Sequence, residues 1–509
     1  MSKSDKSAAS IEKQNLSKVA LKNSSYNFLS LFILKFGGLI FTIIIARILL
    51  PELFGVYALA LSIVSIFLSI SGLGIISSFL RYSSESLGKR KKSLFRGYFS
   101  FFTKVQSILV AIAVFALVFS ARYLSNNVYN KPYLYPILLF SIFYILMESF
   151  KNFISTIFVS LKDLKSVAFL DALLQISKIS FSLLAVILFT GYSKVTGLFI
   201  AFAISSFVVL LLGILMSFKK DKELYVGKRE KIESKKTMKY FWFMGIASLS
   251  LALFASVDTL MLGRFVDSGY LGFYRAALSL VLTLASLFSL SGVLLPIFTQ
   301  IHNKRFERGF HKTFRALMIF AIPAAAGMVF ISRQLIFLVY GSEYLPSAIP
   351  LYFLSPLIII APLVGLYNII FQSKEKPKLL AYGTIISLII NILLNYVLIR
   401  YMLGFGQESA IVGAALATVF SRIFFLILLS TSAKSKFGLK LRGIGLRAPI
   451  FATLVMSLFL LIYDKLVDLN LFYGIVEVII GAGIYFGVLI LIKGVTKQDW
   501  NILKSLIKR

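Results

Sequence analysis

The chain has 509 residues but no cysteine, only two histidines and only 21 acidic residues. Without cysteine the protein forms no disulfide bond, carries no catalytic thiolate and holds no iron–sulfur cluster. The two histidines, His302 and His311, lie nine residues apart in one basic loop, a pattern more typical of solvated side chains than of a metal site. The sequence therefore predicts no metal and no other cofactor.

Apolar residues are abundant instead: 58% of the chain is hydrophobic and the mean hydropathy is +0.88, well above an ordinary soluble domain. Runs of about 20 apolar residues recur, each long enough to cross a hydrocarbon core of roughly 30 Å as a helix. They lack the alternation of barrel strands. The sequence predicts an all-α polytopic membrane protein with about 14 transmembrane helices, at 27–49, 56–80, 97–119, 134–159, 167–191, 195–218, 240–262, 270–297, 314–332, 348–372, 379–401, 409–432, 447–464 and 471–492.

The net charge of +33 is distributed unevenly between the two sides of the predicted membrane. Loops on the side of both termini carry 40 lysines and arginines, whereas the alternate connections carry eight. This is the positive-inside pattern, and it predicts that both termini lie in the cytoplasm. The surplus charge is thereby explained by topology, and no motif for reading nucleic acid is present, so nucleic acid is not an expected partner.

The chain contains an internal repeat. With an offset of 217 the pattern R-x7-G-x-Y-x2-A-L-S-x-V occurs twice, from Arg47 to Val64 and from Arg264 to Val281. At the neighbouring offset of 216, three small residues of helix 6 match helix 12: Gly197 with Gly413, Ala201 with Ala417, and Ser205 with Ser421. Each unit therefore spans six helices, and an even number of crossings gives both units the same orientation.

The repeat divides the chain into an N-terminal lobe at 1–218, a charged cytoplasmic linker at 219–239 and a C-terminal lobe at 240–432, followed by helices 13 and 14 with a basic tail at 433–509. We expect the linker to be a solvated tether. Helix 1 contains Gly37–Gly38, which we expect to interrupt it, and helix 10 contains three prolines that favour kinks, namely Pro350, Pro356 and Pro362.

Three stretches carry a resemblance to a known family: RILLPELFGVYALALS, VDTLMLGRF with LGFYRAA, and NILLNYVLIRYMLGFGQESAIVGAALAT. They are similar to the polysaccharide-biosynthesis branch of the multidrug/oligosaccharidyl-lipid/polysaccharide (MOP) exporter superfamily, which includes the O-antigen flippases. The resemblance covers helices 1 to 12. It implies a MATE/MOP-like pair of six-helix lobes around a central cavity, with helices 13 and 14 added.

The resemblance also implies a flippase or exporter of a polyprenyl-phosphate-linked or polyprenyl-diphosphate-linked oligosaccharide, working by alternating access in the cytoplasmic membrane during surface polysaccharide or glycan assembly. Its partners would be the lipid-linked substrate, the bilayer and a coupling ion, H⁺ or Na⁺. The alternative is a cation-coupled drug or small-molecule antiporter of the same superfamily. No enzyme is predicted, because the outer connections are short and the cytoplasmic ones contain no catalytic constellation.

Basic side chains inside the predicted helices are candidates for binding an anionic headgroup, because an ionisable group at bilayer depth is costly unless it faces protein or water. The candidates are Lys35, Lys178, Arg275 and Arg422. Lys35 has no acid in its own helix, so it either pairs with an acid of another helix or receives an anion. An antiporter of cationic drugs would be expected to carry an acid rather than Lys35 in the first lobe.

Three residues are candidates for coupling or gating: Asp258, Arg275 and Asp171. Asp258 and Arg275 lie at equal distances from the turn between helices 7 and 8, so they are expected to lie at matching depth. They either form an ion pair shielded from lipid or exchange it for a ligand or proton that couples to movement. Asp258 aligns with Phe41 in the first repeat, so the second lobe alone carries this acid. In helix 4, Glu148 and Lys151 are expected to form a structural pair.

Overall fold

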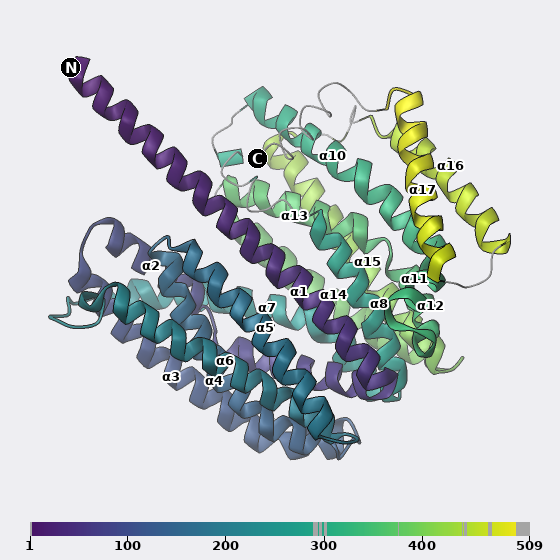
Figure 1. Ribbon diagram of the computed structural model, residues 1–509, viewed down its shortest axis with the longest axis horizontal. Coiled ribbons are helices and arrows are strands. Elements are labelled where there is room, and N and C mark those ends of the chain that lie inside the picture. The colour runs from purple at the N-terminus through teal and green to yellow at the C-terminus, as the bar shows by residue number, and fades with distance from the viewer. Residues whose placement is uncertain are drawn as a thin grey trace. The chain divides into compact units, whose positions relative to one another are not determined.

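A computed structural model of the chain describes residues 3–288, 294, 298–299, 303–374, 376–439, 441, 445–466 and 471–494. The described secondary structure is entirely helical (Figure 1). The chain forms two compact units. The first comprises Met1–Thr42 and Ala60–Ser256, and the second comprises Ile43–Leu59 and Val257–Arg509. The boundaries of both units lie inside helices rather than in loops, because residues 43–59 belong to the second unit although the residues on either side of them belong to the first.

Within the described residues, eleven helices are long and apolar enough to cross a membrane, or twelve if one bent pair counts as a single span. The protein is thus an all-helical polytopic membrane protein, and the predicted number of fourteen spans is approximate. The difference has two causes. The first predicted span and most of the second lie in the single helix α1, which is broken only at Leu50 and ends at Ser71, and the span at Arg447–Tyr463 is short.

The first unit consists of long helices joined by short turns. Its elements are α1 (Lys3–Ser71, shared with the second unit), α2 (Ile75–Gly88), α3 (Lys92–Tyr123), η1 (Leu124–Val128), α4 (Leu134–Ser160), α5 (Leu164–Leu188), α6 (Ser193–Lys220), η2 (Lys222–Leu224) and α7 (Ser234–Phe265). An aromatic core joins α2, α3 and α4, in which Phe79 packs against Phe95, Phe102 and Phe153. This buried core gives the unit rigid helices on which polar side chains can be positioned.

Helix α1 breaks at Leu50, not at Gly37–Gly38. Leu50 has φ 59° and ψ 170°, and it is the single residue inside α1 with non-helical angles. Pro51 follows, and proline disfavours the helical conformation of the residue before it. The expected interruption at Gly37–Gly38 is wrong, because the backbone stays helical there. Gly37 instead allows close packing, since a Cβ atom at this position would lie 3.2 Å from Cγ of Gln175 on α5.

The linker between α6 and α7 is docked on the first unit, so the expectation of a solvated tether is wrong. The Lys92 ammonium at the start of α3 lies 2.8 Å from carboxylate oxygens of both Asp221 and Glu223. The Arg96 guanidinium donates hydrogen bonds to backbone carbonyls of the linker. Leu224 is fully buried in the aromatic core. Basic side chains of α3 meet the linker acids and carbonyls, and these interactions outweigh the chain entropy that favours a tether.

The second unit contains the rest of the chain. Beyond the ends of α1 and α7 its elements are α8 (Ser268–Leu287), α10 (Asn303–Phe330), α11 (Ser332–Tyr340), η3 (Ser342–Ser347), α12 (Ala348–Leu354), α13 (Leu357–Ser373), α14 (Pro377–Leu403), α15 (Gln407–Phe437), α16 (Arg447–Leu466) and α17 (Leu471–Leu491). The segment ending with α12 and the helix α13 meet at a bend of 48°, next to Pro356. One of the three prolines that predicted kinks therefore stands at a bend.

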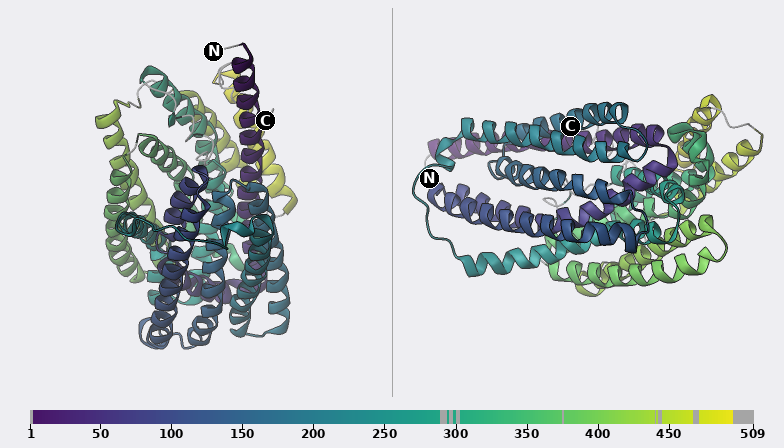
Figure 2. Two further views of the ribbon diagram at one scale, coloured as in Figure 1. Left: turned by 90° about the vertical axis from the view of Figure 1, so that its left-hand side faces the viewer. Right: turned by 90° about the horizontal axis from the view of Figure 1, so that it is seen from below.

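Helices α16 and α17 form a hairpin beside α10 in the second unit (Figures 1 and 2). Tyr485 of α17 is almost fully buried, and its hydroxyl donates a 2.6 Å hydrogen bond to the carbonyl of Ile319 in α10. Met456 and Leu460 of α16 pack in the same cluster. The two C-terminal helices are therefore packed on the unit rather than attached by a loop alone. The predicted basic tail after residue 494 lies outside the described residues.

The two halves of the sequence repeat meet in the second unit at a close helix crossing. A Cβ atom on Gly55 would lie 1.8 Å from the carbonyl oxygen of Ser268, and a Cβ atom on Gly272 would lie 2.0 Å from that of Pro51. The repeat offset of 217 relates Gly55 to Gly272 and Pro51 to Ser268. The contact therefore has the local two-fold symmetry of the repeat, and only glycine allows this backbone approach.

Candidate functional site

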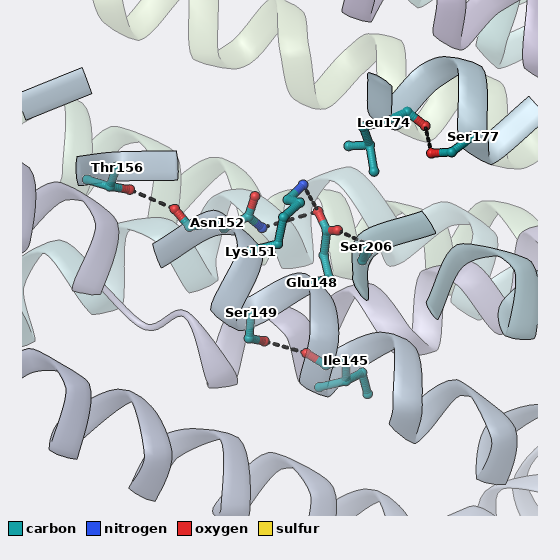
Figure 3. Close-up of polar contacts among 9 residues, drawn as sticks. All are labelled: Ile145, Glu148, Ser149, Lys151, Asn152, Thr156, Leu174, Ser177 and Ser206. Atoms are coloured by element: carbon teal, nitrogen blue, oxygen red, sulfur yellow. Dashed lines mark hydrogen bonds and ion pairs between the residues drawn. The ribbon is translucent and has the colours of Figure 1, made fainter. Parts of the chain in front are cut away.

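The first unit contains a buried ion pair on α4. The Lys151 ammonium lies 2.7 Å from Oε1 of Glu148, and both side chains are largely buried, as predicted for this pair. Asn152 donates to the same oxygen at 3.2 Å, and the Ser206 hydroxyl of α6 donates to Oε2 at 2.7 Å (Figure 3). These partners compensate the hydration that the buried charges lose. The bond from Ser206 also connects α6 to α4.

Two of the predicted site residues of the first unit lie on facing helices. The Asp171 carboxylate of α5 accepts a hydrogen bond from the Ser30 hydroxyl of α1. Farther along the same contact, the Gln175 amide of α5 donates to the carbonyl of Leu34 at 3.5 Å. Lys35 is the next residue of α1 and is half-buried. Helices α1 and α5 are therefore joined at Asp171 and at Gln175, and Lys35 lies on α1 next to the second of these contacts.

The ammonium of Lys178 on α5 lies over two phenyl rings that contact each other. Its ammonium is 4.5 Å from the ring centroid of Phe41 on α1 and 4.3 Å from that of Phe202 on α6. The two ring centroids are 5.6 Å apart. Each ring presents its negative face to the cation, an attraction that is stronger where water is excluded. The charge of Glu148 also acts on Lys178.

The second unit holds a buried carboxylate surrounded by neutral polar side chains. Asp258 of α7 is only 4% exposed. Its Oδ2 accepts hydrogen bonds from the Tyr274 hydroxyl of α8 at 2.9 Å and from the Thr418 hydroxyl of α15 at 2.5 Å. Its Oδ1 accepts from the amides of Asn395 at 2.8 Å and Asn391 at 3.5 Å, both on α14. Three helices thus converge on one acid of α7.

Several oxygens in this cluster have no hydrogen-bond partner. The Oδ1 atoms of Asn391 and Asn395 are buried and unsatisfied, and so is the hydroxyl of Ser387, one turn earlier on α14. The three side chains are spaced by four residues and therefore share one helix face. A carboxylate, amide oxygens and hydroxyls are hard ligands, which suit a cation that prefers oxygen. The cluster can therefore hold a proton or a small hard cation.

Arg275 does not form the expected ion pair with Asp258, although both lie in the described part of the chain. The preceding residue, Tyr274, occupies that place and donates to the carboxylate. Consecutive residues of a helix point about 100° apart, so Tyr274 and Arg275 cannot both face the acid. Arg422 of α15 lies within electrostatic reach of Asp258. The positive charge of Arg422 therefore acts on Asp258, whereas that of Arg275 acts on Tyr57 and Tyr340.

Sequence reasoning missed four residues of the Asp258 cluster, namely Tyr274, Asn391, Asn395 and Thr418. Signals were present for some of them. Tyr274 is one of the identities of the repeat, and Asn391 and Asn395 are two amides four residues apart in an otherwise apolar helix. Polar side chains in membrane helices face protein or water for the same reason as charged ones. Neutral amides inside membrane helices therefore indicate buried polar sites in the same way as acids and bases do.

The chain resembles known transport proteins in both sequence and fold. It is 26% identical over 258 residues to a probable low-salt glycan biosynthesis flippase, Agl15, of Haloferax volcanii, covering 49% of this chain and 52% of the relative. It is 23% identical over 281 residues to an uncharacterized membrane protein in the cps region of Klebsiella pneumoniae, covering 51% of this chain and 54% of the relative. The chain thus spans about half the length of the curated relatives it matches.

Two solved structures have a similar fold. The inward closed conformation of lipid II flippase MurJ matches with a TM-score of 0.71 at 18% identity, covering 93% of this chain and 99% of that one. An inward-facing multidrug resistance MATE family transporter of the MOP superfamily matches with a TM-score of 0.62 at 14% identity, covering 81% and 98%. A model of the polysaccharide biosynthesis protein family matches residues 20–302, more than half of the sequence. The chain therefore belongs to the polysaccharide biosynthesis protein family.

Proposed function

We propose that this protein is a flippase that moves a polyprenyl-phosphate-linked or polyprenyl-diphosphate-linked oligosaccharide across the cytoplasmic membrane by alternating access. Membership in the polysaccharide biosynthesis family supports the glycan, and the MOP-type fold supports transport. The observation that carries the proposal is that each unit holds basic side chains within its membrane helices: Lys35 and Lys178 in the first, Arg275 and Arg422 in the second. In a medium of low dielectric such cations attract a phosphate strongly.

A vesicle assay tests the flippase function. The purified chain is reconstituted into liposomes with a fluorescent polyprenyl-diphosphate oligosaccharide, and transport is read as loss of accessibility to an impermeant quencher. We expect Lys35→Ala to reduce transport at least tenfold without changing the elution profile of the folded protein. Lys104→Ala is the matched control, because Lys104 lies at an exposed position of α3. Normal transport by a well-folded Lys35→Ala variant would remove Lys35 from the headgroup site.

Asp258 is proposed to bind the coupling ion, Na⁺ or H⁺. Its burial and the unsatisfied amide oxygens of Asn391 and Asn395 support this role. In the structure the amide N–H groups of these two residues face the carboxylate. Rotation of each amide by about 180° would present its oxygen to a cation instead, because the amide oxygen and nitrogen are similar in size and shape. Binding would thereby change which helices Asp258 holds together. Ions that favour one conformation over another shift its population.

Ion gradients test this coupling. We expect transport to increase with an imposed Na⁺ or H⁺ gradient, and Asp258→Asn to remove that dependence because the variant lacks the negative charge. Transport by Asp258→Asn that still follows the gradient would refute the role of this acid.

The second candidate is a cation-coupled antiporter of drugs or small molecules, favoured by the MATE-type fold and by the buried acid at Asp258. The same liposomes distinguish the two functions. Gradient-driven efflux of ethidium, with no movement of the lipid-linked oligosaccharide, would support the antiporter and exclude the flippase.

A further inference from the structure

The internal repeat relates the Asp258 cluster of the second unit to the Lys178 cage of the first unit. The offset of 217 for helices 1 and 7 relates Phe41 to Asp258, and the offset of 216 for helices 6 and 12 relates Phe202 to Thr418. Lys178 and Asn395 are also separated by 217 residues, on α5 and α14. The three residues that form a cluster in the second unit are therefore equivalent, by the repeat, to the three residues that form a cluster in the first unit.

The contacts follow the same pattern in both units. In the second unit the Asn395 amide of the fifth helix of the repeat donates to Asp258 of its first helix, while Thr418 of its sixth helix donates to the same carboxylate. In the first unit the Lys178 ammonium of the fifth helix contacts the rings of Phe41 and Phe202, on the first and sixth helices. Both clusters join the same three helices at equivalent depth within the repeat.

The chemistry of the two clusters is opposite. The second unit offers oxygen ligands and one negative charge but has no lysine or arginine at these three positions. The first unit offers two phenyl faces and supplies the positive charge itself. Phenyl faces bind ammonium groups well, whereas they offer no oxygen to a hydrated metal ion.

We propose that the Lys178 ammonium is a tethered cation that occupies, in the first unit, the position at which the second unit binds an exchangeable monovalent cation. This inference rests on the proposed ion-binding role of Asp258. It follows that each chain binds one exchangeable cation rather than two. The Phe41–Phe202 pair is then a site for an alkylammonium group, which the lysine side chain fills. Lys178 then attracts the phosphate only through its charge, and Lys35 is the basic side chain of the first unit that can contact the headgroup.

Chemical rescue tests the cage directly. Lys178→Ala removes three carbons and the ammonium nitrogen, which leaves a space the length of a propylammonium ion beside the two rings. We expect Lys178→Ala to melt at a lower temperature than the wild type, and propylammonium chloride to restore most of the difference. Propanol, which has the same chain without the charge, should restore little. Lys104→Ala is the matched control and should respond to neither compound.

Two outcomes would overturn the proposal. Equal rescue by propanol and propylammonium would mean that the lysine only fills space. A Lys178→Met variant as stable as the wild type would mean that the charge is not needed. Neither outcome would affect the role of Asp258, which is tested separately by its dependence on ion gradients.

Binding stoichiometry gives an independent test. Radioactive ²²Na⁺ bound to purified protein should saturate at one ion per chain in the wild type and at none in Asp258→Asn. The triple variant Phe41→Asp, Phe202→Thr, Lys178→Asn introduces the ligand types of the second unit into the first and should bind two. A wild-type value of two ions per chain, or a folded triple variant that still binds one, would contradict the tethered cation. If the triple variant does not fold, the rescue experiment decides.

Discussion

The glycine crossing between the two repeat hairpins predicts a large effect from adding a single methyl group. In Gly55→Ala the new Cβ would lie 1.8 Å from the Ser268 carbonyl oxygen, 2.7 Å from its carbon and 2.9 Å from the Gly272 nitrogen. All three are backbone atoms, so no flexible side chain can move aside. To reach an ordinary contact the two helices must separate by more than about 1 Å, which disturbs the surrounding packing.

The expected cost lies at the upper end of the range for overpacked cores, about 3 kcal/mol. For domains of 150–250 residues each kcal/mol shifts the melting temperature by roughly 2–4 °C, so Gly55→Ala should melt roughly 6–12 °C below the wild type. Gly272→Ala should behave alike, because its Cβ would lie 2.0 Å from the Pro51 carbonyl oxygen. The double variant should lose less than the sum, because the first methyl already separates the same two backbones.

Size-exclusion chromatography of heated, detergent-solubilised protein measures the effect. Gly269→Ala is the matched control: Gly269 lies in the same helix α8, and a Cβ atom there would meet nothing within 4 Å. We expect this control to melt at or slightly above the wild-type temperature, since alanine is the better helix former. If Gly55→Ala melts together with Gly269→Ala, the close crossing of the two hairpins is not present in the protein.

Two further predictions concern the loops of the first unit at the ends of α4 and α6. Burial raises the pKa of the Asp163 carboxyl, but hydrogen bonds from Lys220 and Ser166 exceed this effect and hold the pKa below its usual value. A carboxyl with a lowered folded-state pKa stabilises the fold above its unfolded pKa of about 3.9, and this contribution is lost as the pH falls through the folded-state value. Asp163→Asn should therefore lower the melting temperature at pH 7, and this difference should shrink as the pH falls below about 3.9. A difference that does not shrink at acidic pH would contradict this assignment. Separately, Arg96→Ala should release the docked linker, because Arg96 donates to two of its carbonyls, and trypsin should then cut after Lys228 or Arg229 several times faster. Lys89→Ala is the control for the second experiment, and equal cleavage rates in the two variants would show that Arg96 does not hold the linker.

The sequence by itself determined that the chain lies in a lipid bilayer, that its fold is helical and that it contains a repeat. Long apolar runs require helices in a bilayer, because no water satisfies the backbone there. Short stretches of sequence were sufficient to assign the family and to identify Gly55 and Gly272 as equivalent positions of the repeat. The Glu148–Lys151 pair was also predictable, because two residues three apart on a helix are neighbours whatever surrounds them.

Only the tertiary structure decided which side chains share a cluster. Asp258 meets Asn391, Asn395 and Thr418 from helices more than a hundred residues away, and matching depth alone could not distinguish Arg275 from its neighbour Tyr274. The docking of the linker was likewise not predictable. Its charge predicts that it is solvated, but only the fold brings Lys92 and Arg96 of α3 next to it. Sequence patterns report the face of a helix relative to its own axis, whereas the rotation of that face toward another helix depends on the packing of the whole unit.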